Sequence, residues 1–263
     1  MLALYLLLLS LVQPAHASAP VAPPPKPYAL GEVDPKCKTG FYTPKILKFL
    51  DHWPPPTLKI ADKRPVLVRA IKTPSQPDVI GVIKHFSVKF PLDKVVEVSE
   101  KFEEYPKIWE DVESVQVESR DRNRTVTSWV RKSPAFFLGK IRYRLQYVTD
   151  KSVKGRVVFR QQLIDGNSVD STDALVILEK MGAAETRITV LNFFNPNAGP
   201  FRSLVEGTIW QKSLENNFKD DIAFRARLEH PDWDLDQITK EAERLLDQFP
   251  IEKVEYTDLV QLD

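Results

Sequence analysis

The feature that most constrains the fold is a series of six strand-like runs followed by one segment of helical length. Each run is rich in β-branched and aromatic residues, and short polar connections separate the runs, a pattern typical of sequential antiparallel hairpins. The runs are Val112–Ser119, Thr125–Arg131, Lys140–Val148, Arg156–Ile164, Ser171–Lys180 and Thr186–Asn195. Residues 201–228 then place Leu214, Phe218 and Ile222 on one helical stripe. The predicted fold class is α+β, an antiparallel sheet packed on helices.

Two further elements frame this series. Val79–Phe90 alternates as a first strand, and a helix is expected from Pro91 to about Phe102 because proline is tolerated in a first helical turn. A second terminal helix is predicted over Leu235–Phe249, with Asp234 as its candidate N-cap. The order of elements therefore predicts one main domain over residues 79–228 and a C-terminal helical extension over 229–263.

Residues 1–17 have the pattern of a secretory signal. The apolar run from Ala3 to Val12 is too short to span a membrane easily, and Ala15-His16-Ala17 has the small-x-small pattern of a cleavage site. Cleavage after Ala17 predicts a periplasmic or extracellular protein. No Lys or Arg precedes the apolar run, so an uncleaved anchor stays open as the alternative.

The region between residues 18 and 78 is predicted to be a proline-rich linker and N-terminal extension. Five prolines between Ser18 and Pro27 favour extended conformations. A short helix is expected over Pro44–His52 before Trp53-Pro54-Pro55-Pro56 ends it. Cys37 is the single cysteine, so no internal disulfide can form, and we assign it no role.

Composition and motifs argue against several classes of function. The chain has 37 Lys and Arg against 36 Asp and Glu, a net charge of +1, so nothing favours a nucleic-acid partner. Its histidines are widely spaced and no cysteine pair exists, which gives a metal site no support. Its glycines are isolated and form no phosphate-binding loop. We therefore predict no metal, no cofactor and no catalytic residue of a common motif.

Three segments carry a family resemblance: Phe86–Val98, Glu104–Trp109 and Val112–Val115. They resemble the opening of START-like (SRPBCC) helix-grip proteins, in particular the branch with polyketide cyclases and coenzyme Q-binding proteins. The likeness covers residues 79–228. It implies a curved antiparallel sheet wrapped around a long C-terminal helix, with an internal cavity that receives lipids, isoprenoids or polyketides. The long N-terminal extension and the extra C-terminal helix depart from the family pattern, which leaves the cavity entrance and any partner surface open.

Strand alternation assigns the two faces of the predicted sheet. With simple turns, one face is apolar and is expected to face the helix, whereas the other carries cations that should stay hydrated. The apolar face contains Trp129, Ile141, Tyr143, Leu145, Val157, Phe159, Leu175, Ile177, Ile188, Val190 and Phe194; the basic face contains Lys140, Arg142, Arg144, Arg160 and Arg187. Apolar residues also fall on the basic face, so the N-terminal extension is expected to cover part of it; they are Val158, Val176, Leu191 and Phe193.

The same register places a polar row across the apolar face. It pairs residue 127 with 143, 143 with 161, 161 with 173 and 173 with 192, which aligns Thr127, Tyr143, Gln161, Asp173 and Asn192. Such a row either binds the polar end of an amphipathic ligand or satisfies its own hydrogen bonds at a wet cavity mouth. A one-residue bulge in any strand would turn part of the row outward.

The leading hypothesis is an exported carrier, sensor or sequestering protein for an apolar small molecule or lipid. The first alternative is a cyclase or dehydratase that uses Asp173 and Tyr143 for proton transfer; the second is a protein-interaction module without a small ligand. The simplest interpretation of the basic face is a solvated surface, and peripheral membrane contact is the alternative. Each proposed ligand contact competes with ordinary core packing; the contacts are Trp129, Tyr143, Phe159, Gln161, Asp173, Leu175, Val190, Asn192, Leu214 and Phe218.

Overall fold

The computed structural model describes residues 26–32, 36–38, 64–71, 79–132, 140–167, 169–196, 202–251 and 256–257. The expected signal over residues 1–17 and the expected short helix over 44–52 lie outside these ranges, so both stay predictions. No helix within the described ranges is both long enough and apolar enough to cross a membrane.

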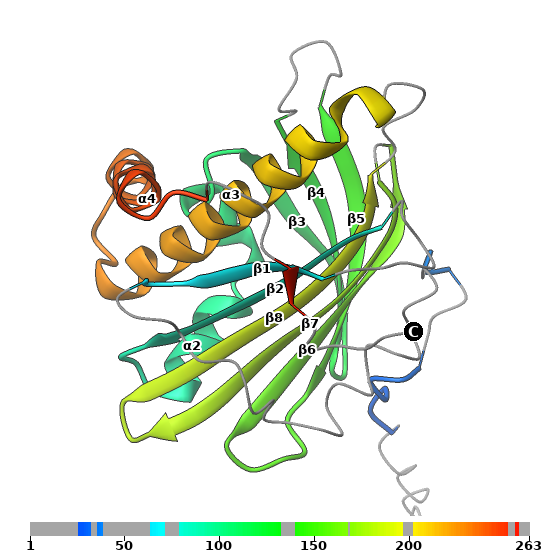
Figure 1. The fold of residues 1–263 in the computed structure, drawn as a ribbon. Coiled ribbons are helices and arrows are strands. Elements are labelled where there is room, and N and C mark those ends of the chain that lie inside the picture. Colours follow the sequence, from blue (N-terminus) through cyan, green and yellow to red (C-terminus); the bar gives the residue numbers. More distant parts are fainter. Residues whose placement is uncertain are drawn as a thin grey trace, which may run out of the picture.

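The described strands form one curved sheet of nine strands in the order β3-β4-β5-β6-β7-β8-β2-β1-β9 (Figure 1). All neighbouring strands are antiparallel except β1 and β9, which are parallel. The strands are β1 (Leu67–Ile71), β2 (Ile80–Val88), β3 (Val112–Asp121), β4 (Arg124–Arg131), β5 (Ile141–Asp150), β6 (Arg156–Gly166), β7 (Val169–Gly182), β8 (Glu185–Pro196) and β9 (Tyr256–Thr257). Strands β2 to β8 confirm the expected series, while β1 and β9 were not expected.

The described residues also form four helical segments: α2 (Leu92–Ser99), the 3₁₀ helix η1 (Phe102–Lys107), α3 (Arg202–Glu229) and α4 (Leu235–Gln248). The expected helix after Pro91 ends at Ser99, three residues earlier than predicted. The predicted cap of α4 is confirmed, because Gln237 N donates to Asp234 Oδ1 at 2.9 Å and the Gln237 side chain accepts from Asp234 N. Helix α3 lies in the concave side of the sheet and α4 packs on α3 (Figure 1). The predicted α+β helix-grip architecture is therefore confirmed.

Apolar side chains pack on both faces of the sheet. The larger cluster lies on the concave face and joins the sheet to α2, η1, α3 and α4. The smaller cluster lies on the convex face, where Leu30 packs against it; its buried members are Ile71, Val79, Ile83, Val158, Leu175, Ile177, Leu191 and Phe193. Part of the convex face is therefore a second buried layer, whereas Lys140 and Arg142 stay exposed and Arg144 is 41% exposed, as predicted for the cations of this face.

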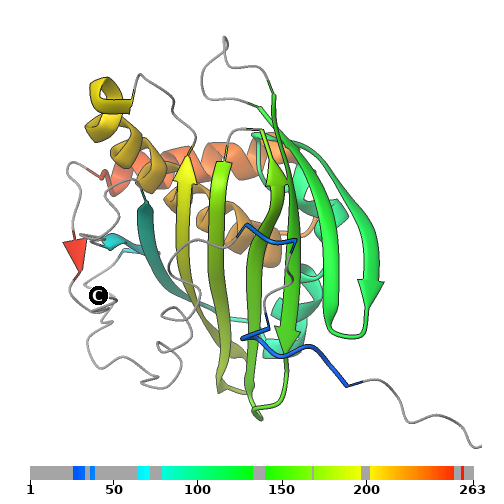
Figure 2. The ribbon, with the colours of Figure 1, turned by 90° about the vertical axis from the view of Figure 1, so that its right-hand side faces the viewer.

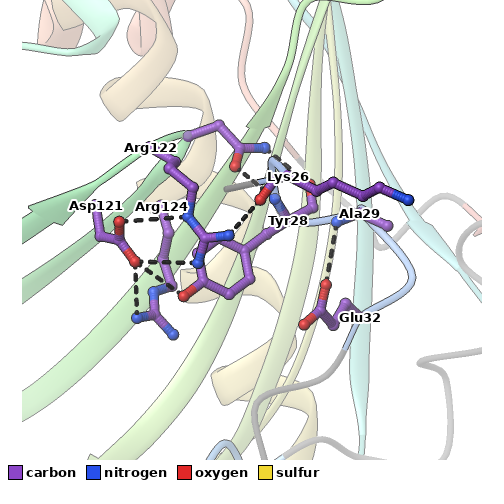
Figure 3. A network of polar contacts seen from close by, with 8 residues as sticks. Lys26, Tyr28, Ala29, Glu32, Asp121, Arg122 and Arg124 are labelled. Carbon is purple, nitrogen blue, oxygen red and sulfur yellow. Dashed lines mark hydrogen bonds and ion pairs between the residues drawn. The ribbon is translucent and has the colours of Figure 1, made fainter. Parts of the chain in front are cut away.

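Residues 26–32 of the predicted linker pack against this convex face (Figure 2). Tyr28 exchanges two backbone hydrogen bonds with the Asn123 side chain, each 2.8 Å long, and its hydroxyl donates to Asp121 Oδ2 (Figure 3). The guanidinium carbons of Arg122 and Arg124 lie 3.9 and 4.2 Å from the centre of the Tyr28 ring. Residues 26–32 are therefore anchored to the domain, and the prediction of a linker is wrong for them.

The β3–β4 turn is shaped to hold this anchor. Arg122 has a backbone φ of 55°, in the left-handed region that residues with a side chain rarely adopt. In this conformation its guanidinium lies on the Tyr28 ring and donates to the Lys26 carbonyl (Figure 3). The contacts of Arg122 to the N-terminal segment offset the cost of its unfavourable backbone conformation.

Arg160 corrects the expectation of a hydrated basic face. Its side chain is 0% exposed, because Nε and Nη2 donate to the two carboxylate oxygens of Asp173 at 3.1 and 2.8 Å. Its third nitrogen, Nη1, donates to the Leu30 carbonyl. The expected cover by the N-terminal extension is confirmed at this point, and the cation is buried because all its nitrogens are hydrogen-bonded.

Candidate functional site

A cavity of about 200 Å³ lies between the concave face of the sheet, η1 and α3. Six of its wall residues are aromatic side chains from η1, the loop after it, β4 and β5: Phe102, Tyr105, Trp109, Trp129, Tyr143 and Tyr147. Antiparallel pairing fixes the backbone of the three strand residues and sets Trp129 opposite Tyr143. Half of this aromatic wall therefore stands on rigid sheet positions, and the other half is supplied by η1 and the loop after it.

The aromatic rings form a connected wall. The rings of Tyr105 and Trp109 stack at 4.4 Å between centroids, and those of Trp129 and Tyr143 stack at 6.0 Å with 12° between their planes. Phe102 contacts Tyr147 at 4.6 Å. Rings packed in this way hold one another in place and present flat apolar surface to whatever occupies the cavity.

The tyrosine hydroxyls of this wall stay protonated at neutral pH. Burial raises the pKa of Tyr143, Tyr105 and Tyr147 above the ordinary value of 10.0, because a buried phenolate would lose its hydration. The Tyr105 hydroxyl already donates to the Ser99 carbonyl at 3.1 Å. The wall therefore offers neutral phenols and no additional negative charge.

A buried ion pair forms part of the cavity lining. Lys84 Nζ, from β2, lies 2.7 Å from Asp221 Oδ1, from α3, and the two side chains are 10% and 8% exposed. The other carboxylate oxygen, Asp221 Oδ2, has no hydrogen-bond partner within the described part of the chain. Burial raises the pKa of Asp221, while Lys84 opposes this rise. One oxygen of this buried carboxylate is thus enclosed without a donor among the described residues.

A second charged group borders the cavity. Arg131 donates to both oxygens of Asp111 at 2.8 and 2.7 Å and lies 3.6 Å from Asp220. Burial raises the pKa of Asp220 from 3.8 to about 6, although the Arg131 cation lowers it. Trp109 Nε1 fixes the helix next to this group by donating to the Asp220 carbonyl at 3.0 Å. Asp220 is therefore the carboxyl at the cavity whose protonation changes nearest neutral pH.

Comparison with solved structures identifies the architecture. A STAR-related lipid transfer protein from Xanthomonas axonopodis matches with a TM-score of 0.53 and 14% identity, over 64% of this chain and 96% of that one. Human STARD10 matches with a TM-score of 0.50 and 14% identity, over 75% and 84% of the two chains. A protein from Thermus thermophilus matches with a TM-score of 0.50 and 18% identity, over 58% and 99%.

The chain has the START-like helix-grip fold. At such low identity the likeness concerns the fold alone. No protein-family model matches the sequence, and no curated protein matches it. The roles of individual residues in this START-like cavity must therefore come from its own geometry.

Six of the ten predicted ligand contacts line the START-like cavity: Trp129, Tyr143, Phe159, Gln161, Val190 and Asn192. Leu214 and Phe218 are 1% and 2% exposed in the core and are not among the residues that line it. On α3 the lining residues are Asn217, Asp220, Asp221 and Phe224. The predicted stripe of α3 packs in the core beside the cavity. The residues that line the cavity belong to a neighbouring row on the surface of the same helix.

The predicted positions of Asp173 and Leu175 are wrong. Both lie on the convex face, Asp173 paired with Arg160 and Leu175 in the smaller apolar cluster. Gln161 pairs with Ala174, and Ala174 with Asn192, where the simple turns predict residue 173 in both cases. The β6–β7 pairing is displaced by one residue from the predicted register along its whole paired length, and a shift of one residue exchanges the two faces of a strand. A register shift between Lys180 and Gly182 displaces the β7–β8 pairing as well, which keeps Asn192 on the cavity side.

The rest of the predicted register also changes. Thr127 pairs with Leu145, and Gln161 pairs with Tyr147. These shifts are even, so Tyr143, Gln161 and Asn192 still line the cavity without forming the predicted continuous row. Thr127 is buried and accepts a hydrogen bond from Trp129 Nε1 at 2.7 Å. Ile177 and Val176 exchange faces together with Asp173 and Leu175.

The sequence interpretation missed Lys84, Arg131, Asp220 and Asp221. A signal existed for Lys84, because it alternates with Val82 and Phe86 in a strand whose inward positions are otherwise apolar. No local signal connects it to Asp221, 137 residues later. Within the described residues, no group of three or more His, Cys, Asp or Glu side chains is arranged to hold a metal ion.

Proposed function

We propose that this protein binds one apolar small molecule with a polar end in the START-like cavity, as a carrier, sensor or sequestering protein. The observation that carries the proposal is a hollow aromatic wall next to a buried carboxylate with one unpartnered oxygen. Apolar walls with few, fixed polar groups are the usual composition of ligand sites. A close-packed core would not leave this volume.

The size of the cavity narrows the class of ligand. Drug-sized ligands occupy pockets of about 300–1,000 Å³, whereas this cavity measures about 200 Å³. A compact ring system or one hydrocarbon chain fits this space better than a lipid with two acyl chains. The lipid-transfer name of the Xanthomonas protein supports an apolar ligand in general, and the volume favours a small one.

The two residues proposed for proton transfer in the enzyme alternative lie apart in the structure. Asp173 lies on the far face of the sheet from Tyr143, so these two residues cannot act on one ligand. Asp220 and Asp221 are carboxyl groups of the cavity lining, and burial raises the pKa of Asp220 to about 6. Binding without turnover is the function that we propose, and recovery of a chemically altered ligand would favour the enzyme.

A cavity-filling variant tests the proposal. Ala174 is a cavity-lining residue of β7, and Ala174→Phe should place a ring inside the cavity. We expect native mass spectrometry to detect a bound apolar mass on the wild-type protein from its own host and none on Ala174→Phe. Val153→Phe is the matched control, because Val153 is 45% exposed. An empty wild type that also shows no thermal shift with single-chain alcohols, isoprenoids or ring compounds would contradict the proposal.

We further propose that the protein is exported and cleaved after Ala17. The support is the Ala15-His16-Ala17 pattern after the apolar run. N-terminal sequencing of the protein from its host should begin at Ser18. An intact residue 1 in a membrane fraction would instead favour an anchor.

A further inference from the structure

Two carboxamide side chains, Gln161 and Asn192, flank a small residue on the cavity side of the sheet. Antiparallel pairing sets Gln161 opposite Ala174 and Ala174 opposite Asn192, on the neighbouring strands β6, β7 and β8. All three residues line the START-like cavity. Two steps between neighbouring strands place the backbones of Gln161 and Asn192 about 9–10 Å apart. Ala174 carries only a methyl group, so it fills little of the gap between the two amides.

The next row of the same three strands is apolar. Phe159 lies opposite Val176 and Val176 lies opposite Val190, and these three residues also line the cavity. A ligand whose polar end lies over Ala174 can therefore place its apolar body on this row. The two amides and the apolar row adjoin on one face of the sheet.

Both amides keep polar atoms that find no partner within the described part of the chain. The side chain of Gln161 makes no hydrogen bond there, and Asn192 Nδ2 donates to no described residue, whereas Asn192 Oδ1 lies 3.4 Å from the Thr172 hydroxyl. Both residues are half-buried. The described side chains that hold an enclosed polar atom without a partner include neither of them, although they include Asp221. The free atoms of Gln161 and Asn192 are therefore accessible.

The chemistry of the carboxamide determines which group fits between Gln161 and Asn192. Each carboxamide has a nitrogen that donates and an oxygen that accepts. A ligand hydroxyl can accept from Asn192 Nδ2 and donate to Gln161 Oε1, and a ligand carbonyl oxygen can accept from both amide nitrogens. Either group satisfies polar atoms that a purely apolar occupant would leave without a partner.

The charged side chains around the cavity disfavour an ionised head group. Lys84 is paired with Asp221, and Arg131 is paired with Asp111 and Asp220. Both cations are thus neutralised by carboxylates, and a ligand carboxylate would add a further negative charge to a poorly hydrated site. An ionised head group between two neutral amides would lose its hydration without gaining a counter-ion. An uncharged head group avoids this cost.

We propose that Gln161 and Asn192 form the polar subsite of the cavity, and that they select ligands whose polar end is an uncharged hydroxyl or carbonyl oxygen lying over Ala174. This inference rests on the proposed function, because it assigns the polar end of the ligand to two residues of the same cavity. It excludes ligands that end in a carboxylate.

Three naphthalene probes that differ in one substituent test the head group: 2-naphthol, 2-methylnaphthalene and 2-naphthoate. Equilibrium dialysis at pH 7.5, with each probe measured by its own ultraviolet absorbance, gives the three dissociation constants. We expect 2-naphthol to bind about tenfold more tightly than 2-methylnaphthalene, since it gains hydrogen bonds at both amides. We expect 2-naphthoate, which is ionised at this pH, to bind more weakly than 2-naphthol.

Matched leucine variants isolate the two amides. Gln161→Leu/Asn192→Leu removes both from the cavity, and Gln146→Leu makes the same change at a buried glutamine of β5 that is not among the residues lining the cavity. We expect the double variant to bind 2-naphthol no more tightly than 2-methylnaphthalene, and Gln146→Leu to keep the tenfold preference. Urea titration verifies that the variants are folded. If the double variant does not fold, each single variant should lower the preference to about threefold.

The outcomes separate the inference from the proposed function. If the folded double variant keeps the preference for 2-naphthol, or if 2-naphthoate binds as tightly as 2-naphthol, the inference is wrong while apolar binding stands. If 2-methylnaphthalene binds the wild type and 2-naphthol gains nothing over it, the amides do not bind the head group. If none of the three probes binds, the proposed function fails for compact ring ligands, and the inference fails with it.

The cavity-filling variant Ala174→Phe locates the bound probe. Its ring should occupy the gap between Gln161 and Asn192 and abolish the binding of 2-naphthol. If Ala174→Phe binds 2-naphthol like the wild type, the probe lies outside the cavity, and this result contradicts the inference.

Discussion

Two buried ion pairs occupy opposite faces of one sheet and differ in how they are completed. On the convex face, both oxygens of Asp173 and all three nitrogens of Arg160 are hydrogen-bonded, and both side chains are at most 2% exposed. At the cavity, Lys84 binds one oxygen of Asp221, and the other oxygen is buried without a hydrogen-bond partner among the described residues. The convex pair is complete in its hydrogen bonds, whereas the cavity pair is not. The position of an ion pair in a fold therefore says less about function than its unsatisfied atoms do.

The largest expected effect comes from breaking the convex pair. Arg160→Met should lower the free energy of unfolding by about 3–5 kcal/mol, because it leaves the Asp173 carboxylate buried without its cation. Urea titration measures the loss, and Arg160→Met/Asp173→Leu should recover most of it. If Arg160→Met lowers the free energy of unfolding by less than about 1 kcal/mol, water reaches Asp173 and the ion pair is not fully buried.

One titratable group on each face of the sheet should change the free energy of unfolding with pH, and the two changes should have opposite signs. Burial and the nearby Arg187 lower the pKa of His85, on the convex face, from 6.5 to about 4. The unfolded chain therefore binds more protons below pH 6.5, and from pH 7 to pH 5 this group should remove about 2 kcal/mol of stability. His85→Gln should lose correspondingly less stability than the wild type over this range.

Asp220, at the cavity, should change the free energy of unfolding with pH in the opposite direction to His85. Its pKa in the folded state is raised to about 6, so the folded chain binds more protons between pH 3.8 and 6, and its contribution to stability falls as pH rises through 6. From pH 7 to pH 5 it should add about 1 kcal/mol. Urea titrations of Asp220→Asn at both pH values should lack this gain; a gain equal to that of the wild type would contradict it.

Breaking the cavity pair should cost less than breaking the convex pair. Lys84→Met leaves Asp221 without its cation, but the two side chains of this pair are 10% and 8% exposed, against 0% and 2% in the convex pair. We expect a loss of about 1–2 kcal/mol in urea titration, below that of Arg160→Met. If Lys84→Met lowers the free energy of unfolding more than Arg160→Met does, the two ion pairs do not differ in the way described above.

The smallest effect is expected at the N-terminal anchor. Tyr28→Ala removes the ring between Arg122 and Arg124 and the hydroxyl bond to Asp121, and should destabilise the protein by about 1 kcal/mol. Tyr28→Phe keeps the ring and should cost less. Both variants should bind 2-naphthol like the wild type, because Tyr28 lies on the convex face. A weakened affinity in either would show that the two faces are coupled.

The sequence predicts the elements of this fold better than the orientation of their side chains. Alternation located β2 to β8, and helical length located α3 and α4, because these signals are local. The face of β7 was wrong because β7 pairs with β6 one residue away from the predicted register, and the sequence of the strand itself does not show this displacement. The pairs Lys84–Asp221 and Arg131–Asp220 were missed because each joins residues about 90 or more positions apart, and alternation carries no information about such partners.

The N-terminal anchor determines when the convex face can be completed during folding. Tyr28 binds Asn123, 95 residues later, and Leu30 accepts from Arg160, 130 residues later. These segments leave the ribosome early, yet they can dock only after β3 to β7 have formed, and contacts between such distant positions form slowly. Until then the charges of Arg160 and the apolar cluster around Leu175 are open to water or to another chain. Pulse-labelling hydrogen exchange should find the β3–β4 turn amides protected before those of residues 28–30.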